Sequence, residues 1–292
     1  MKLIVDSGST KADWALVDDG GVMVREVKTP GINPVHQSDE EILHVLRGEL
    51  ELPAQPTEVY FYGSGVTEAQ KARMERLLDE AFPGAKVEAE SDLLGAARAL
   101  FGNQPGIACI LGTGSNSCLY DGREIVMNTP PLGYILGDEG SGAYLGKRFL
   151  NELLKDVLPQ SLKKKFYDWS HLDYPTIINK VYREPMANRF LASLCPFISQ
   201  AIEKDGDEAE IDEADALSFM VEESFREFFE KNTFPYIEHL GEMEEEIPPF
   251  GFVGSIAYYF KEQIYDALEL MDCELGEIVQ SPLDGLVRFH AK

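Results

Sequence analysis

The sequence predicts an α/β protein that contains a β-β-β-α-β-α unit twice. Two apolar, strand-like runs end in turns rich in glycine and hydroxyl side chains, at residues 6–11 and 112–116. Each run begins the same order of predicted elements, and one helix of each half opens with Gly-x-x-Arg, at Gly95 and at Gly285. An internal repeat of this kind supports an architecture more strongly than any single strand assignment.

Turn residues set the ends of the predicted strands in the first half. Asp19-Gly20-Gly21 is typical of a hairpin turn, and Gly63-Ser64-Gly65 ends the fourth strand. Apolar residues at helical spacing predict a helix over 68–82. The predicted strands are 3–6, 12–17, 22–28, 58–62 and 86–90, and the predicted helices are 40–50, 68–82 and 93–101.

The second half repeats this order and carries a long insertion over about residues 130–249. A charge run at 203–215 lies inside it; because its spacing does not match a calcium loop, a solvated loop leading into a helix is the better interpretation. The apolar face from Leu217 to Phe229 is typical of a core stripe. The predicted strands are 107–111, 117–120, 124–127, 250–253 and 277–279, and the predicted helices include 143–158, 256–270 and one that opens at 282.

Length and charge restrict the classes of function. The chain has 292 residues, which leaves room for roughly two domains at about 150 residues each. Its 26 Lys and Arg against 51 Asp and Glu give a formal charge of −25. This balance argues against a nucleic-acid interface and against docking on an anionic membrane, since both need clustered positive charge. An anionic ligand such as a nucleotide must therefore be held by local N–H groups, lysine and metal.

The chain shows no obvious targeting or zinc-binding pattern. No apolar run approaches the roughly 20 residues that span a bilayer, and the segment before Asp6 is too short for a signal peptide. The four cysteines form neither a CxxC pair nor a zinc spacing, and Cys109 and Cys118 lie in apolar runs. These features favour a cytoplasmic protein with reduced thiols.

The turn after the first strand has a composition suited to phosphate oxygens. It offers small side chains, hydroxyls, backbone N–H groups and Lys11. Asp6, at the end of the strand, could orient a divalent cation through water, because magnesium favours oxygen ligands and keeps several waters. The alternative interpretation is a tight hairpin with a serine-rich tip.

Four motifs in order resemble those of the sugar-kinase/heat-shock-70/actin ATPase superfamily, and more narrowly its N-acetylglucosamine kinase branch, grouped with the BadF/BadG/BcrA/BcrD-type ATPases. The motifs are the Asp-Ser-Gly-Ser-Thr-Lys run at 6–11, Leu-Gly-Thr-Gly-Ser-Asn at 111–116, Gly-Asp-Glu-Gly-Ser-Gly at 137–142 and Phe-Val-Gly-Ser at 252–255. The resemblance covers nearly the whole chain and is weakest between about 155 and 245.

The resemblance implies two ribonuclease H-like domains in an actin-like ATPase fold, with a nucleotide cleft between them. The expected domains are 1–105 and 106–281; the second contains the helical insertion 130–249, and the C-terminal segment 282–292 is a candidate to pack back on the first. The implied reaction is phosphoryl transfer from MgATP to a sugar hydroxyl, which needs positioning, charge neutralisation and a base.

Asp92 is the candidate base, because it ends a strand where the family places its catalytic aspartate. Its alternative role is to cap the helix that follows, and Ser91 is an equally good cap. Asp6 would orient the hydrated Mg²⁺. The expected nucleotide contacts are Gly8, Ser9, Thr10 and Lys11 on one side, Gly112, Thr113 and Gly114 opposite, and Gly254 and Ser255 at the adenosine.

The positions that match sugar contacts in N-acetylglucosamine kinases are Asn33, Ser64, Asn116 and Asp138. Amide, hydroxyl and carboxylate groups suit a ligand rich in hydroxyls. The alternatives are ordinary turn roles, such as Asn33 before a proline and Asp138 as a helix cap. Pro131-Leu132-Gly133-Tyr134 stands where the family often has Gly-Trp-Gly, so a related amino sugar or a muropeptide-derived sugar is equally compatible.

Two other functions stay open at this point. In the activator branch of the family, ATP turnover drives electron transfer to a partner enzyme through an iron–sulfur cluster held by exposed cysteines, and no cysteine here lies in an obvious loop. A non-catalytic nucleotide or sugar sensor is the second alternative, although the chain retains Asp6, Lys11 and Asp92. The expected partner is a small-molecule sugar, with neither nucleic acid nor membrane, and the superfamily often forms homodimers.

Overall fold

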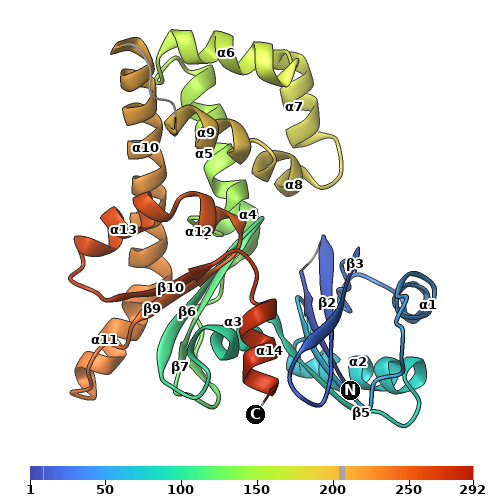
Figure 1. Ribbon diagram of the computed structural model, residues 1–292. Helices are drawn as coiled ribbons and strands as arrows, with labels where there is room; N and C mark the ends of the chain where they lie inside the picture. Colours follow the sequence, from blue (N-terminus) through green and yellow to red (C-terminus); the bar gives the residue numbers. More distant parts are fainter. Residues whose placement is uncertain (9, 204–207, 292) are drawn as a thin grey trace. The chain divides into compact units, whose positions relative to one another are not determined.

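The computed structural model describes residues 1–8, 10–203 and 208–291, and it contains two five-stranded sheets with helices (Figure 1). The strand orders are β3-β2-β1-β4-β5 and β10-β9-β6-β7-β8. Read from the third strand of each half, both sheets have the order third, second, first, fourth, fifth. The predicted duplicated α/β architecture is therefore confirmed.

The first sheet places three strand ends at one edge. Its strands are β1 (Lys2–Ser7), β2 (Lys11–Val17), β3 (Met23–Pro30), β4 (Glu58–Gly63) and β5 (Lys86–Ser91). Strand β2 is antiparallel to β1 and β3, whereas β1, β4 and β5 are parallel. Ser7 pairs with Gly63, and Gly63 pairs with Ser91, so the parallel strands end in register. The residues that follow these strands therefore meet at the carboxyl edge of the sheet.

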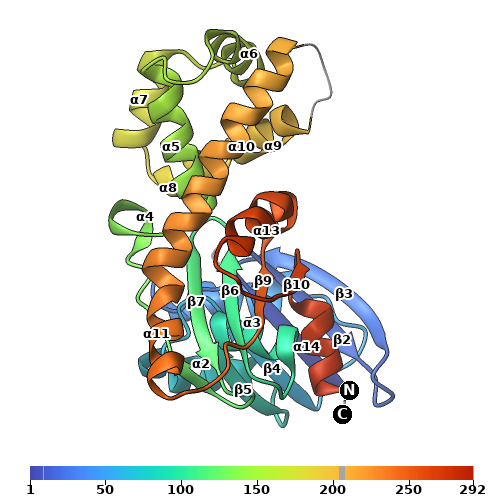
Figure 2. The same cartoon turned by 90° about the vertical axis from the view of Figure 1, so that its left-hand side faces the viewer.

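Helices cover both faces of the first sheet. Buried Trp14 and Phe61 face the cluster that includes α1 (Asp39–His44), the π-helical η1 (Val45–Glu49) and α2 (Glu68–Ala81). On the other face, α3 (Asp92–Phe101) packs on the C-terminal α14 (Leu283–His290) (Figure 2). The shared Gly-x-x-Arg spacing has a packing reason here. A Cβ on Gly285 would lie 2.5 Å from the carbonyl oxygen of Ala99, and one on Gly95 would lie 2.8 Å from Cβ of Tyr62.

A buried polar network holds α14 to the first sheet. His290 Nε2 is 2.8 Å from the Tyr62 hydroxyl, which also accepts a 2.8 Å hydrogen bond from Arg98. Arg98 is paired with Glu88 at 3.0 Å. Burial lowers the pKa of His290 to about 4, so its ring is neutral at pH 7 and joins the network without a buried charge.

The second sheet carries the insertion. Its strands are β6 (Gly106–Leu111), β7 (Ser115–Tyr120), β8 (Ile125–Met127), β9 (Phe250–Val253) and β10 (Leu275–Val279), of which β9 and β10 are parallel. The helices are α4 (Gly133–Leu136), α5 (Gly142–Leu154), α6 (Gln160–Ser170), α7 (Tyr174–Tyr182), α8 (Ala187–Ala192), α9 (Cys195–Ile202), α10 (Glu208–Phe228), the π-helical η2 (Phe229–Thr233), α11 (Phe234–Glu242), α12 (Ser255–Tyr259) and α13 (Lys261–Glu269). The predicted core stripe on α10 is confirmed, since Leu217, Phe225 and Phe228 are fully buried.

Three helices differ from the sequence prediction. The predicted helix 40–50 becomes π-helical from Val45, in a turn that contains the weak helix former Gly48. The predicted helix 143–158 ends at Leu154, because Asp156 takes a left-handed φ of 57° ahead of Pro159. The predicted helix 256–270 is broken at Phe260, whose ring is buried in the core and whose φ and ψ of −116° and 33° are not helical.

The chain forms two compact units. Unit 1 consists of Met1–Ala108, Tyr120–Val126 and Ser281–Lys292, and unit 2 consists of Cys109–Leu119 and Met127–Gln280. Among the described residues, no helix combines the length and apolar character needed to cross a bilayer.

Candidate active site

The turn between β1 and β2 in unit 1 is closed by backbone hydrogen bonds. The Gly8 N–H donates to the Lys11 carbonyl at 3.0 Å, and the Thr10 carbonyl accepts from Gly31 at 3.1 Å. Lys11 Nζ lies 2.9 Å from the carboxylate of buried Asp13, which keeps the ammonium at this end of the sheet. Ser9, which the sequence also assigns to phosphate, lies outside the described residues.

Two carboxylates, those of Asp92 and Asp13, act on Asp6 at the carboxyl edge of the first sheet. Asp6 is half-buried and is the register partner of Asp13. Burial raises the pKa of Asp6 to about 7, the charges of Asp92 and Asp13 add to the rise, and Lys11 opposes it. A bound cation would relieve this repulsion, so the carboxylates fit a magnesium ion.

The kind of coordination follows from the donors present. Within the described part of the chain, no group of three His, Cys, Asp or Glu side chains is arranged to hold a metal directly. Magnesium is often bound through one or two carboxylates, phosphate oxygens and waters, and Asp6 suits that mode.

Two predicted sugar residues lie near the ends of β1 and β4. The Ser7 hydroxyl accepts from the Ile32 N–H at 2.9 Å and lies 3.1 Å from the Ile32 carbonyl, which fixes the loop that carries Asn33. The Ser64 N–H donates to the Ser7 carbonyl at 2.8 Å. Asn33 Oδ1 accepts from a neighbouring N–H in its own turn, the role given as its alternative, and also packs against Gly65, where a Cβ would lie 2.2 Å away.

Replacing Ser7 with Ala is expected to cost about 1–3 kcal/mol, because the Ile32 N–H would lose its partner in a buried setting. The free energy of unfolding, measured by urea denaturation, checks the result. Ser64→Ala is a matched control, since Ser64 bonds to β1 through its backbone N–H. Equal stability of Ser7→Ala and wild type would show that the hydroxyl does not fix the loop.

Asp92 is the first residue of α3 and does not cap it. Ser91 is the N-cap, and its hydroxyl accepts from the Leu94 N–H at 3.2 Å. The alternative capping role therefore belongs to Ser91. Burial raises the pKa of Asp92 to about 6, and a hydrogen bond from the Leu93 N–H opposes the rise. At pH 7 the group is mostly ionised and able to accept a proton.

The glycine turn of unit 2 is tied to the start of α5. The Gly112 N–H donates to the Gly114 carbonyl at 2.9 Å, so this N–H is engaged within the turn. The Gly112 and Thr113 carbonyls accept from Gly142 and Ala143 at 2.8 and 3.1 Å. These bonds fix the turn against the Gly-Asp-Glu-Gly-Ser-Gly motif.

Asp138 lies directly against this turn. Its backbone has a left-handed φ of 54°, and its carboxylate is 3.0 Å from where a Cβ on Gly114 would stand. Burial raises the pKa of Asp138 to about 6, and a hydrogen bond from the Ser115 backbone opposes the rise. Ser141 is the N-cap of α5, so the capping role given as the alternative for Asp138 belongs to Ser141.

Gly254 lies against the end of β6, just before the glycine turn. Its φ is 122°, and a Cβ would lie 2.2 Å from the Leu111 carbonyl oxygen, a contact that excludes any side chain. Its N–H donates to the Val279 carbonyl at 3.0 Å. Exposed Ser255 opens α12. Unit 2 thus gathers the glycine turn, Asp138 and Gly254 around the end of β6.

Sequence reasoning assigned no role to three residues that support the unit 2 part of the site. Glu139 is buried and paired with Lys231 at 3.3 Å, while Asn128 and Tyr236 contact β7. The position of Glu139 inside a named motif was the only signal in the sequence. Asn128 and Tyr236 carry none, because their contacts depend on the tertiary fold.

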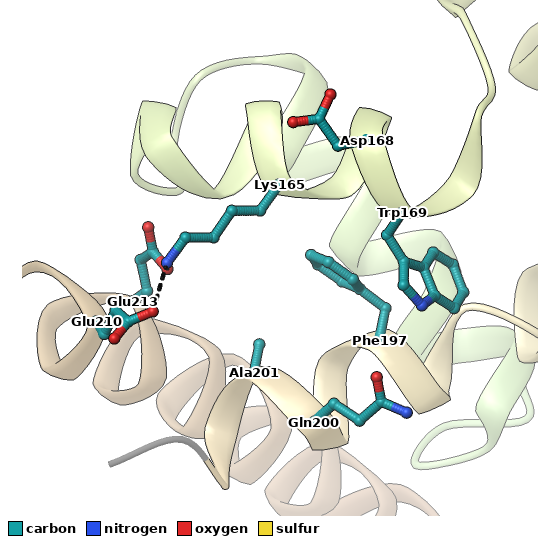
Figure 3. Close-up of a pocket in the computed structure, with 8 residues that line it drawn as sticks. All are labelled: Lys165, Asp168, Trp169, Phe197, Gln200, Ala201, Glu210 and Glu213. Carbon is teal, nitrogen blue, oxygen red and sulfur yellow. Dashed lines mark hydrogen bonds and ion pairs between the residues drawn. The ribbon is translucent and has the colours of Figure 1, made fainter. Parts of the chain in front are cut away.

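A cavity of about 280 Å³ lies elsewhere in unit 2, between α6, α9 and α10 (Figure 3). Trp169 and Phe197 line it, and Lys165 lies between Glu210 and Glu213 at 3.1 and 2.8 Å. None of the predicted site residues lines this cavity.

Comparison with solved structures agrees with the class that the fold and motifs indicate. A structure from Porphyromonas gingivalis, named "putative N-acetylglucosamine kinase", is 42% identical with a TM-score of 0.89 over 100% of this chain and 99% of its own. A protein of the same name from Chromobacterium violaceum is 20% identical with a TM-score of 0.71 over 99% of this chain and 98% of its own. A ROK family glucokinase from Streptomyces griseus, solved with glucose and AMPPNP, is 13% identical with a TM-score of 0.55 over 98% of this chain and 97% of its own.

The last two similarities show the fold, that of the sugar-kinase and actin-like ATPases. No family model and no curated protein sequence matches the chain. The identity of 42% over the full length shows the narrower relationship: the chain belongs to the N-acetylglucosamine kinase family.

Proposed function

We propose that this protein transfers the γ-phosphoryl group of MgATP to a hydroxyl of N-acetylglucosamine or a related amino sugar. The observation that carries the proposal is the register of β1, β4 and β5, which brings the carboxylates of Asp6 and Asp92 to one edge of the first sheet, in a chain of the N-acetylglucosamine kinase family. Phosphoryl transfer to an alcohol needs a site for a metal and a proton acceptor, and these two residues provide them.

In this proposal the unit 1 residues act on the transferred phosphate. Asp6 would hold hydrated Mg²⁺, which neutralises phosphate charge when bound. Gly8, Ser9, Thr10 and Lys11 would bind the β- and γ-phosphates, and Asp92 would take the proton of the attacking hydroxyl. Because the pKa of Asp92 is about 6, the carboxylate is the main form at pH 7.

The unit 2 residues complete the nucleotide contacts. Gly112, Thr113 and Gly114 would contact the phosphates, while Gly254 and Ser255 would lie beside the adenosine. The lack of a side chain at Gly254 lets this segment lie against Leu111, the residue before the glycine turn. We propose that 1–105 and 106–281 are the functional domains.

The four proposed sugar contacts offer complementary hydrogen-bonding groups. Asp138 is an acceptor when ionised, Ser64 donates and accepts, and Asn33 and Asn116, whose Oδ1 atoms are engaged within the protein, can donate through Nδ2. Groups of these kinds suit the hydroxyls and the acyl group of an amino sugar.

The cysteines favour a kinase over the activator ATPase. Cys109, Cys118 and Cys195 are buried, and Cys273 is half-buried. Burial raises the pKa of Cys195 to about 12, so its thiol stays protonated at neutral pH. A bridging iron–sulfur cluster needs accessible thiolates, and these three buried side chains do not present them.

A screen of ATP consumption against a panel of neutral and amino sugars tests the proposal. We expect an N-acetylated amino sugar to stimulate ADP release, with the phosphorylated sugar identified by mass spectrometry, and chelation of magnesium to stop turnover. If no sugar stimulates turnover and the purified protein contains iron, the kinase proposal is wrong and the activator function is the better account.

A further inference from the structure

The orientation of the Asn116 side chain is fixed by two hydrogen-bond donors. Its Oδ1 accepts from the Ser117 N–H at 3.0 Å and from Nδ2 of Asn128 at 2.9 Å. An amide oxygen has two lone pairs, so both are occupied. The groups that Asn116 can still offer a ligand are the two N–H donors of Nδ2, and no described residue accepts from them.

Asn128 is itself held in place from the interior of unit 2. Its Nδ2 lies 2.7 Å from the Ser117 carbonyl and 3.2 Å from that of Thr129. The Thr129 N–H donates to the hydroxyl of Tyr236 at 2.8 Å, and that hydroxyl lies 3.0 Å from the Ser117 carbonyl. Tyr236 is fully buried on α11, so the segment around Asn128 is anchored by the core.

We propose that Asn128 is a positioning residue that sets substrate specificity: by holding Asn116 Oδ1, it makes Asn116 a donor that binds an acyl carbonyl oxygen and rejects an ammonium group. This inference rests on the proposed sugar-kinase function and names the contact by which the site would distinguish a 2-acylamino sugar from a free 2-amino sugar. A carbonyl oxygen can only accept hydrogen bonds, so it is the complement of a group that can only donate. An ammonium group facing the same Nδ2 would set hydrogen-bond donors against donors. A site built to bind a polar group disfavours a ligand that leaves the donors of the site unpaired.

The substitution Asn128→Asp tests this role because it keeps the size of the side chain and removes its donors. A carboxylate at position 128 cannot donate to Oδ1 of Asn116 and repels it, so the Ser117 N–H is the one donor left to hold this oxygen, and the amide is no longer fixed in one orientation. The site would then no longer present donors alone, and the added negative charge would favour an ammonium group. Asn128→Ala removes the contact without adding a charge. Because Asn128 is exposed, neither change creates a buried cavity.

Isothermal titration calorimetry with N-acetylglucosamine and glucosamine measures the preference without requiring turnover. We expect the wild type to bind N-acetylglucosamine at least about 10-fold more tightly, as for a site built to recognise one polar group. Asn128→Asp should lower this preference at least about 10-fold, and Asn128→Ala by about 2- to 10-fold, the effect of one hydrogen bond. Asn151→Asp, which makes the same change at an exposed position on α5, should keep the wild-type ratio.

Three results overturn the inference: a wild type that does not prefer the acylated sugar, a wild type that binds neither sugar, or an Asn128→Asp protein that keeps the wild-type ratio. Thermal unfolding shows whether Asn128→Asp is folded, and Asn128→Ala gives the decisive ratio if it is not. Failure of the proposed function is seen separately, as sugar binding without any phosphorylated product in the presence of MgATP.

Discussion

Replacing Asp92 with Asn is expected to lower kcat by about 10²- to 10⁴-fold, the usual contribution of a general base. Asn keeps the shape of the side chain and an oxygen that can accept the hydrogen bond from Leu93, so folding and substrate binding should change little. The proton of the attacking hydroxyl then has no acceptor at that position. Steady-state kinetics at saturating ATP and sugar, together with the thermal unfolding midpoint, measure both effects.

The pH profile provides a second readout of the same residue. Burial raises the pKa of Asp92 to about 6, and the reaction needs the ionised form. The wild-type kcat should therefore fall as the pH drops through about 7 to 6, where Asp6 and then Asp92 take up protons. The residual activity of Asp92→Asn should keep the part of this fall that Asp6 causes and lose the part near pH 6 that reports Asp92.

Ser91→Ala is the matched control for Asp92→Asn, because Ser91 caps α3 and lies one residue away. Loss of the cap should cost about 0.5–2 kcal/mol of stability and leave kcat within a few-fold of wild type. Full sugar-dependent activity of Asp92→Asn, or an equal loss of kcat in Ser91→Ala, would show that Asp92 is not the base.

Most of the fold could be predicted because its signals are local. Strand ends at Ser7, Gly63 and Ser91 coincide with changes from apolar residues to turn residues, and the same order recurs in the second half. The break at Phe260 could not be predicted, since helical periodicity continues through it. That break depends on burial of one aromatic ring in the core, which sequence spacing does not encode.

The candidate site likewise contains residues that local sequence signals predict and residues that they do not. Residues at strand ends, such as Asp6 and Asp92, follow from the motifs, because register places the ends of parallel strands together. Residues that support the unit 2 part of the site come from distant segments: Tyr236, which contacts Ser117, is 119 positions away from it, and Asn232, which contacts Glu139, is 93 positions away. A single sequence cannot predict such contacts because they arise from packing of the insertion on the sheet.

Gly254→Ala is expected to destabilise the protein and to weaken nucleotide binding. A Cβ at this position would lie 2.2 Å from the Leu111 carbonyl oxygen, and the φ of 122° is one that residues with a side chain rarely adopt. Backbone strain of this kind costs of order 1–3 kcal/mol before the steric overlap is added. Leu111 precedes the glycine turn, so relief of the overlap must displace the proposed phosphate and adenosine contacts. We therefore expect a lower thermal midpoint and a KM for ATP raised about 10-fold or more, as for a loss of about 1.4 kcal/mol of binding energy.

Gly241→Ala separates this local effect from a general effect of replacing glycine. Gly241 is exposed on α11, and nothing lies within 4 Å of the position its Cβ would take. Because Ala favours a helix over Gly by about 1 kcal/mol, this variant should be as stable as wild type or more stable, with an unchanged KM for ATP. If both variants behave alike, or if Gly254→Ala keeps wild-type stability and nucleotide affinity, the close approach of Gly254 to β6 is not what forms the nucleotide contact. A KM effect confined to Gly254→Ala would support its place beside the nucleotide, because overlap with Leu111 moves the backbone of that segment and the control leaves it in place.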